Sequence, residues 1–141
     1  MKKHIIIILA LFPLILSMIF YSSLPEQVAI HWNSAGEVDN YSSKLFGLLL
    51  LPIITLAVTL LLLAIPKIDP LKRNIEKFKD YYEYFIIVLL IFMLIIHLQT
   101  ILWNLGIEIS PNLLLPILLG ILFFLLGIFL SKVKRNWFIG I

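Results

Sequence analysis

Four blocks of apolar residues, each about as long as a bilayer is thick, constrain this chain more than any other feature. The hydrocarbon core of a bilayer, roughly 30 Å, needs about 20 apolar residues at a helical rise of 1.5 Å each. A lone segment in lipid can satisfy its backbone hydrogen bonds only as a helix. The sequence therefore predicts an all-α integral membrane protein with one membrane domain, residues 1–141, and four transmembrane helices at about 4–21, 45–65, 84–103 and 113–130.

The amino-acid composition also indicates that the chain has the lipid bilayer as a partner. Hydrophobic residues make up 62% of the sequence, charged residues 13%, and the mean hydropathy is +1.09. A soluble domain carries about a quarter charged residues and could not bury so many apolar side chains at this length. Cysteine is absent, which excludes disulfides and thiolate chemistry. We expect a multi-pass protein of the cell membrane.

The first block could also be read as a cleaved signal peptide. It opens on basic residues and continues as "HIIIILALFPLILSMIF". No small-x-small cleavage site follows in "YSSLPEQ". We therefore interpret it as a retained transmembrane helix.

Basic residues predict the orientation of the four helices. Ten of the eleven Lys and Arg residues fall in the N-terminus, the second connection and the C-terminus, and the first connection has only Lys44. The positive-inside rule then places both termini and the inner loop, 66–83, in the cytoplasm, with the loop 22–44 outside. The excess positive charge is assigned to topology, so we expect no direct binding of nucleic acid.

The inner loop carries a helical pattern of its own. Asp69 is a good N-cap and Pro70 a good first helical residue. Apolar residues then recur at spacings of four, three and four at Leu71, Ile75, Phe78 and Tyr82. This pattern predicts an amphipathic cytoplasmic helix before the third transmembrane helix, lying on the membrane surface. A docking surface for a cytoplasmic partner is the alternative.

The outer loop, "LPEQVAIHWNSAGEVDNYSSK", is rich in turn residues. Gly36 can adopt positive φ, and Asp39 can accept hydrogen bonds from nearby backbone N–H groups. Trp32 suits the headgroup region of a bilayer. The part "LPEQVAIHW" has the extended character of a short strand. We expect an ordered extracytoplasmic cap over the helices.

A metal or acid–base site is a competing interpretation of the same loop. His31, Glu37 and Asp39 supply one imidazole and two carboxylates. No second His lies nearby, and the spacing matches no established zinc or calcium loop. We expect no metal, no cofactor and no enzymatic activity.

Two separated motifs carry a resemblance to a known family. The stretch "YSSLPEQVAIHWNSAGEVDNYSSK" resembles the opening segment of the SdpI family, and "KRNWFIGI" is similar to a later element of that family. The first match rests chiefly on Leu24, Pro25, Val28, Ile30, His31, Trp32, Asn33, Gly36, Asp39, Ser43 and Lys44. The second includes Asn136, Trp137, Phe138 and Gly140. In the family, the second element continues into Arg-Thr-Pro-Trp and further helices, so we expect this chain to be a shortened form.

The resemblance implies immunity to a secreted toxic peptide. Named members of the family confer such immunity, and some are linked to signalling through a membrane-sequestered, repressor-type cytoplasmic regulator. For this chain we expect recognition of the toxin by binding at the outer loop. A small transporter or channel component is the alternative function, and a membrane-embedded hydrolase ranks third.

Two further groups of residues have competing interpretations. His97, with Gln99 close by, lies inside the third apolar block, where an ionisable side chain is costly unless it is neutral or paired. It either packs through a hydrogen bond to a neighbouring helix or forms a proton or ligand site. The "NWFIGI" element has the composition of an ordinary interfacial anchor, and the resemblance favours a more specific role.

The orientation can be tested by cysteine labelling in intact cells. We expect Ser34→Cys to react with an impermeant maleimide and Asn74→Cys to be protected, because the basic residues flank the second position. The reverse labelling pattern would overturn the orientation.

Overall fold

The computed structural model describes residues 2–140, so Met1 and Ile141 of the predicted domain lie outside the described part. Four long helices dominate it: α1 (Lys2–Phe20), α2 (Lys44–Ile68), α4 (Lys79–Asn104) and α5 (Pro111–Leu130). Four short elements join them: the 3₁₀ helix η1 (Tyr21–Ser23), the strands β1 (Gln27–Trp32) and β2 (Val38–Ser43), and the helix α3 (Lys72–Glu76).

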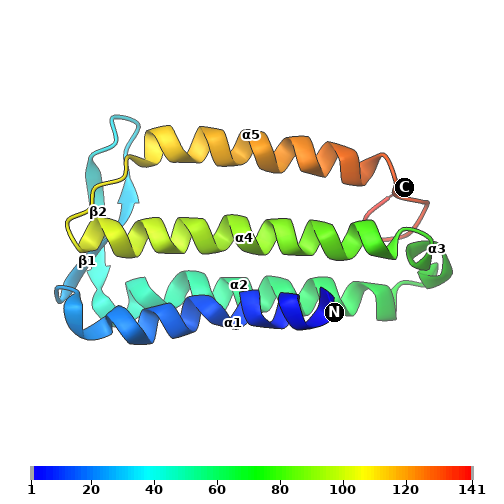
Figure 1. The fold of residues 1–141 in the computed structure, drawn as a ribbon, viewed down its shortest axis with the longest axis horizontal. Coiled ribbons are helices and arrows are strands. Elements are labelled where there is room, and N and C mark those ends of the chain that lie inside the picture. Colours follow the sequence, from blue (N-terminus) through cyan, green and yellow to red (C-terminus); the bar gives the residue numbers. More distant parts are fainter. Residues whose placement is uncertain (1, 141) are drawn as a thin grey trace.

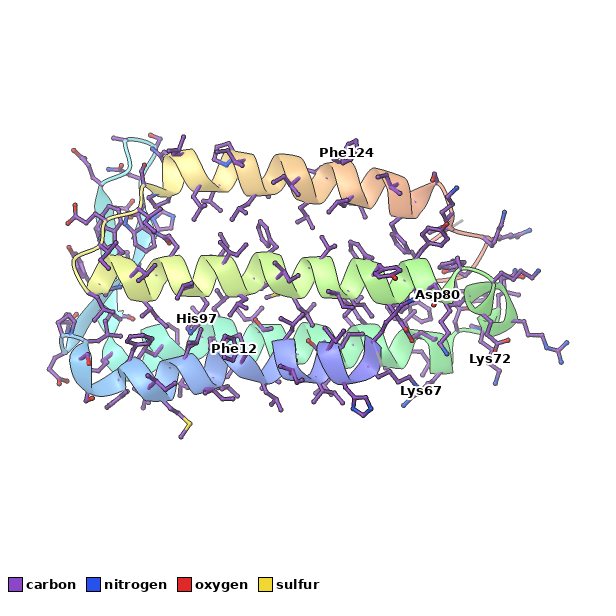
Figure 2. All side chains as sticks on the ribbon, viewed as in Figure 1. Phe12, Lys67, Lys72, Asp80, His97 and Phe124 are labelled. Carbon is purple, nitrogen blue, oxygen red and sulfur yellow. The ribbon has the colours of Figure 1, made fainter. Side chains whose placement is uncertain are left out.

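The long helices lie side by side, and the short elements that join them gather at the two ends of the bundle (Figure 1). Strands β1 and β2 form a hairpin at one end, called the hairpin end below. Helix α3 and both termini lie at the other, called the α3 end. Helices α1, α2 and α4 pack against one another, whereas α5 packs mainly against α4. Phe124 on α5 points away from the other helices (Figure 2).

Each long helix has the length and apolar composition needed to cross a membrane. The four helices are compatible with a multi-pass membrane protein. They extend beyond the predicted apolar blocks, most clearly at α4, which begins at Lys79 where residue 84 was expected. Helices can continue past the hydrocarbon into the headgroup region, where polar side chains are solvated.

Two apolar clusters hold the bundle together. The larger lies toward the α3 end and includes Ile6, Ala10, Ile65, Ile75, Phe78, Tyr82, Ile86, Leu90 and Phe129. Within it, the ring of Phe129 on α5 stacks on Phe85 of α4 with 4.8 Å between ring centroids. The smaller cluster, Leu24, Val28, Leu48 and Ile101, seats the hairpin on the helices.

The inner connection differs from the predicted surface helix. Its helical part is the five residues of α3, and the residue at the N-cap is Leu71 where Asp69 was expected. Ile75 on α3, Phe78 just before α4 and Tyr82 on α4 are all buried together in the larger cluster. The hydroxyl of Tyr82 donates to the carbonyl of Leu62 on α2 at 2.6 Å. The apolar stripe therefore packs on the bundle where contact with lipid was expected, because the neighbouring helices cover it.

Asp69 joins this connection to the C-terminal segment. Its carboxylate is buried; Oδ1 accepts the N–H of Leu71 at 2.6 Å, and Oδ2 accepts the N–H of Trp137 at 2.9 Å. The side-chain amide of Asn74 donates to the carbonyl of Arg135 at 2.8 Å. These bonds fix residues far apart in the sequence against each other.

The C-terminal segment is organised by Asn136. Its Oδ1 faces the backbone N–H groups of Phe138, Ile139 and Gly140 at 3.1, 2.7 and 3.3 Å. A Cβ on Gly140 would lie 2.4 Å from Cγ1 of Val133, so only glycine fits there without a shift. The element therefore has a structural role, with the side chains of Trp137 and Phe138 left exposed.

Removal of the Asp69 carboxylate should destabilise the α3 end. In Asp69→Ala the N–H groups of Leu71 and Trp137 lose their acceptor, which we expect to cost about 1–3 kcal/mol of unfolding free energy in detergent micelles. Glu108→Ala removes an exposed carboxylate at the hairpin end and serves as the matched control. Equal stability of the two variants, or unchanged protease resistance of the C-terminal segment in Asp69→Ala, would contradict this role.

Candidate functional site

The outer-loop motif folds as a β-hairpin with a turn built around Asn33. Strands β1 and β2 pair antiparallel, with Val28 opposite Ser42 and an irregular register near His31. Asn33 Oδ1 accepts the backbone N–H groups of Ala35 at 2.9 Å and Glu37 at 3.0 Å. Asx-type bonds of this kind replace the backbone pairing that a turn interrupts.

Gly36 has the conformation that the sequence predicts, whereas Asp39 makes a different contact from the one expected. Gly36 has φ of +83°, as predicted for the residue that makes the turn. Asp39 was expected to hold the turn, but the bonds that do so belong to Asn33. The Asp39 carboxylate instead accepts a hydrogen bond from His31 Nδ1 across the two strands at 2.5 Å. That pair joins the two strands and is largely exposed.

The hairpin is fastened to α4 by Asn104. Its side-chain Oδ1 accepts the N–H of Ala29 at 2.7 Å, and its Nδ2 donates to the carbonyl of Ala29 at 3.0 Å. The same Nδ2 also donates to Thr100 at 2.9 Å. Beside it, the rings of Trp32 and Trp103 meet edge-to-face at 5.4 Å. Trp32 was expected to seat the loop on the bilayer surface; in the structure its contact is with α4.

Contacts with α2 and α5 complete the attachment. A Cβ on Gly47 of α2 would lie 2.3 Å from Cγ2 of Val28, so the strand packs directly on the helix backbone. Asn112 of α5 donates from Nδ2 to the carbonyl of Ser34 in the turn at 2.6 Å. At the base of the hairpin, the buried Lys44 forms an ion pair with Glu26 at 3.0 Å. The hairpin is thus held on three helices.

A cavity of about 330 Å³ lies beneath this hairpin, between α2, α4 and α5. Its polar lining comes mainly from His31, Trp32, His97, Gln99, Thr100 and Asn112, and its apolar lining includes Ile30, Leu50, Leu51, Ile54, Ile96, Leu114 and Leu115. None of the described residues that line it is Lys, Arg, Asp or Glu. The cavity therefore suits an uncharged group with hydrogen-bonding capacity.

His97 reaches from α4 toward α1 and α2 (Figure 2). Its Nε2 lies 2.9 Å from the hydroxyl of Ser17 on α1. That hydroxyl also lies 2.8 Å from the carbonyl of Leu48 and 3.0 Å from that of Pro13. In the tautomer with the proton on Nε2, His97 donates to the Ser17 hydroxyl, which then donates to one of the two carbonyls. His97 is thus bonded to a neighbouring helix, and in this tautomer its Nδ1 is a free acceptor.

Two buried polar atoms on residues that line the cavity have no partner within the described part of the chain. They are Nδ1 of His97 and Nε1 of Trp32. One is an acceptor in the tautomer above and the other is a donor. Buried polar atoms are nearly always paired in folded proteins, but these two have almost no accessible surface, so a ligand or ordered water would reach them only after the surrounding side chains move.

The remaining predicted residues fall in three places. Gln99 lines the cavity and donates to the carbonyl of Ile109, which holds the α4–α5 connection. Pro25 precedes β1, and Ser43 is the last residue of β2, where its side chain does not cap α2. The Asn136 element lies at the α3 end, so the two motifs do not form one site. Within residues 2–140 no group of three His, Cys, Asp or Glu side chains could hold a metal ion.

Sequence reasoning missed the residues that seat the hairpin. Ser17, Gly47, Asn104 and Asn112 were not singled out, although each is a small or polar residue in or beside an apolar block. That position was the available signal, because a polar side chain in lipid needs a partner. Which partner it finds depends on how the helices pack.

Residues 8–56 match the sequence model of a protein family described as a domain of unknown function, DUF1648. This domain is found in membrane proteins. The matched residues include most of α1, the whole hairpin and the first half of α2. No curated protein and no solved structure matches the chain.

Gly47 allows a direct test of the hairpin seat. Gly47→Ala should destabilise the protein by about 1–3 kcal/mol, because the new methyl group forces Val28 and the strand away from α2. Gly120→Ala on α5 meets no atom within 4 Å and should leave the unfolding free energy in detergent unchanged or slightly raised. Adding Val28→Ala should partly restore Gly47→Ala. If both glycine variants behave alike, the hairpin does not depend on this contact.

Proposed function

We propose that this chain is an SdpI-like integral membrane protein that gives immunity to a secreted toxic peptide by binding it, without covalent chemistry. The observation that carries the proposal is the hairpin-capped cavity, whose lining is partly polar and contains no Lys, Arg, Asp or Glu among the described residues. The resemblance of the hairpin sequence to the SdpI family points to the same end of the molecule.

A peptide group matches the chemistry of the cavity. Its N–H and its carbonyl can form hydrogen bonds with polar side chains of the lining such as His31, Thr100 and Asn112. The group is uncharged, as is most of the lining, and the apolar walls would receive the neighbouring side chain. A hydrogen bond to the polar lining offsets the desolvation of a peptide group, which favours a bound peptide over a purely apolar occupant.

The size of the cavity supports partial insertion of a larger molecule. Ligand pockets usually measure about 300–1,000 Å³, and this one lies at the small end of that range. In our proposal one short segment of an amphipathic toxin enters between α2 and α5. The rest of the toxin lies along the apolar surface of α5, where residues such as Leu113 and Ile117 are exposed.

The proposal requires the hairpin end to face outward, where a secreted peptide arrives. Ten of the eleven Lys and Arg residues lie toward the α3 end, in α1, the last turn of α2, α3, the start of α4 and the segments beside them. This distribution favours a cytoplasmic α3 end. The exposed Trp137 and Phe138 at that end would then be available to a cytoplasmic regulator of the repressor type.

Protection of sensitive cells tests the function. We expect cells that produce this chain to survive the peptide toxin that characterised SdpI-family proteins neutralise. Gly36→Val should abolish protection at unchanged membrane abundance, because a β-branched residue is poorly tolerated at positive φ and would crowd Asn112. Ser34→Ala changes a neighbouring exposed side chain and should protect normally.

Two results would count against the hairpin-centred function. One is equal protection by Gly36→Val and Ser34→Ala. The other is survival of cells with the unmodified chain no better than that of cells with an empty vector, at comparable membrane abundance. A small transporter or channel component would then be the function to examine, by uptake or conductance measurements on the reconstituted chain.

A further inference from the structure

A second cavity, of about 340 Å³, lies at the α3 end of the bundle. All four elements of that end line it: α1, α2, α3 and α4. The cavity therefore lies at the opposite end of the molecule from the hairpin, and nothing in the proposed function uses it.

The lining of this cavity separates into an apolar part and a charged part. The apolar part comes from Ile7, Leu63, Pro66, Ile75, Tyr82 and Ile86, and the charged part from Lys3, Lys67, Lys72, Lys79, Glu76 and Glu83. Ile7 is 51% exposed, so the apolar part continues onto the outer surface of α1 that faces lipid. The hydroxyl of Tyr82 is already bonded to Leu62, which leaves its ring as the surface offered.

The positive charge of the cavity exceeds the negative charge of its own lining. Lysine contributes four charges and glutamate two. Among the ion pairs between residues 2–140, none involves Lys3, Lys67, Lys72 or Lys79. The neighbouring Asp80 is engaged with Lys2 in the ion pair that ties α1 to α4. Lys67 and Lys72, on adjacent elements at this end, are labelled in Figure 2.

We propose that this cavity binds one anionic phospholipid of the surrounding bilayer. The phosphate group accepts hydrogen bonds from the lysine ammonium groups, and the acyl chains lie along Ile7, Leu63 and Ile86. A soluble phosphate would use only the charged part and leave the apolar part exposed. A zwitterionic lipid would use the apolar part but would not neutralise the charge. Only an anionic amphiphile meets both halves of the lining.

Such a lipid would bridge the elements that form the α3 end. Lys3 belongs to α1, Lys67 to α2, Lys72 to α3 and Lys79 to α4, so the basic lining comes from four segments. Each lysine near the membrane surface raises the affinity for anionic lipid about fivefold. Several lysines around one cavity distinguish bound lipid from the diffuse attraction that any basic surface produces.

The test is lipid binding by the purified full-length chain in detergent, read by native mass spectrometry. Phosphatidylglycerol and phosphatidylcholine with identical acyl chains are added at equal concentration. We expect phosphatidylglycerol adducts to predominate on the unmodified chain. In Lys67→Gln/Lys72→Gln, phosphatidylglycerol affinity should fall roughly tenfold or more, with phosphatidylcholine binding unchanged.

The matched control removes the same charge from the same end but outside the cavity. Lys132 and Lys134 are exposed and do not line it, so Lys132→Gln/Lys134→Gln should keep phosphatidylglycerol affinity within about twofold of the unmodified chain. Equal losses in the two double variants would show diffuse attraction to a basic surface and overturn the site, as would no loss in either.

Water-soluble competitors separate the lipid from its headgroup alone. Inorganic phosphate and glycerophosphoglycerol, at the concentration of the lipid, should leave the phosphatidylglycerol adduct in place because they cannot occupy the apolar part. Displacement by either would identify a phosphate site and overturn the lipid proposal. These lipid-binding experiments do not measure protection against the toxin. A negative result in them would therefore not contradict the hairpin-centred function.

Discussion

The amide of Asn104 is the contact on which the functional end of the molecule depends. A two-stranded hairpin leaves the outer edge of each strand unpaired, and an isolated hairpin is marginally stable at best. Asn104 pairs with both the N–H and the carbonyl of Ala29, as a third strand would. The hairpin thereby gains a fixed position on α4 and covers one side of the cavity beneath it.

Both ends of the bundle use the same device to close short segments at the membrane surface. Asn33 Oδ1 accepts two backbone N–H groups in the hairpin turn, and Asn136 Oδ1 faces three in the C-terminal segment. In each case a side-chain oxygen replaces backbone pairing that the local geometry does not allow. Both segments can then stay compact where water is scarce, and each is bonded to a distant element, through Asn112 at one end and Asp69 at the other.

Helix α5 is held mainly at its ends, which leaves room for the cavity along its side. At the hairpin end, Asn112 bonds the turn and Gln99 bonds the carbonyl of Ile109 just before the helix. At the α3 end, Phe129 stacks on Phe85. Few of its other side chains are buried. The resulting space between α2 and α5 is what our proposal assigns to a segment of the toxin.

The sequence by itself determined the helical elements and the conformation of Gly36, because hydropathy, proline and glycine act through local geometry and solvation. It also grouped Ile75, Phe78 and Tyr82 on one face, since helical periodicity is a local property. Only the tertiary structure decided what that face touches: the bundle covers it and α3 is reduced to one short helix. The contacts of Gly47 with Val28, Asn104 with Ala29, and Asp69 with Trp137 were equally out of reach, because each joins residues whose separation is set by how the helices pack.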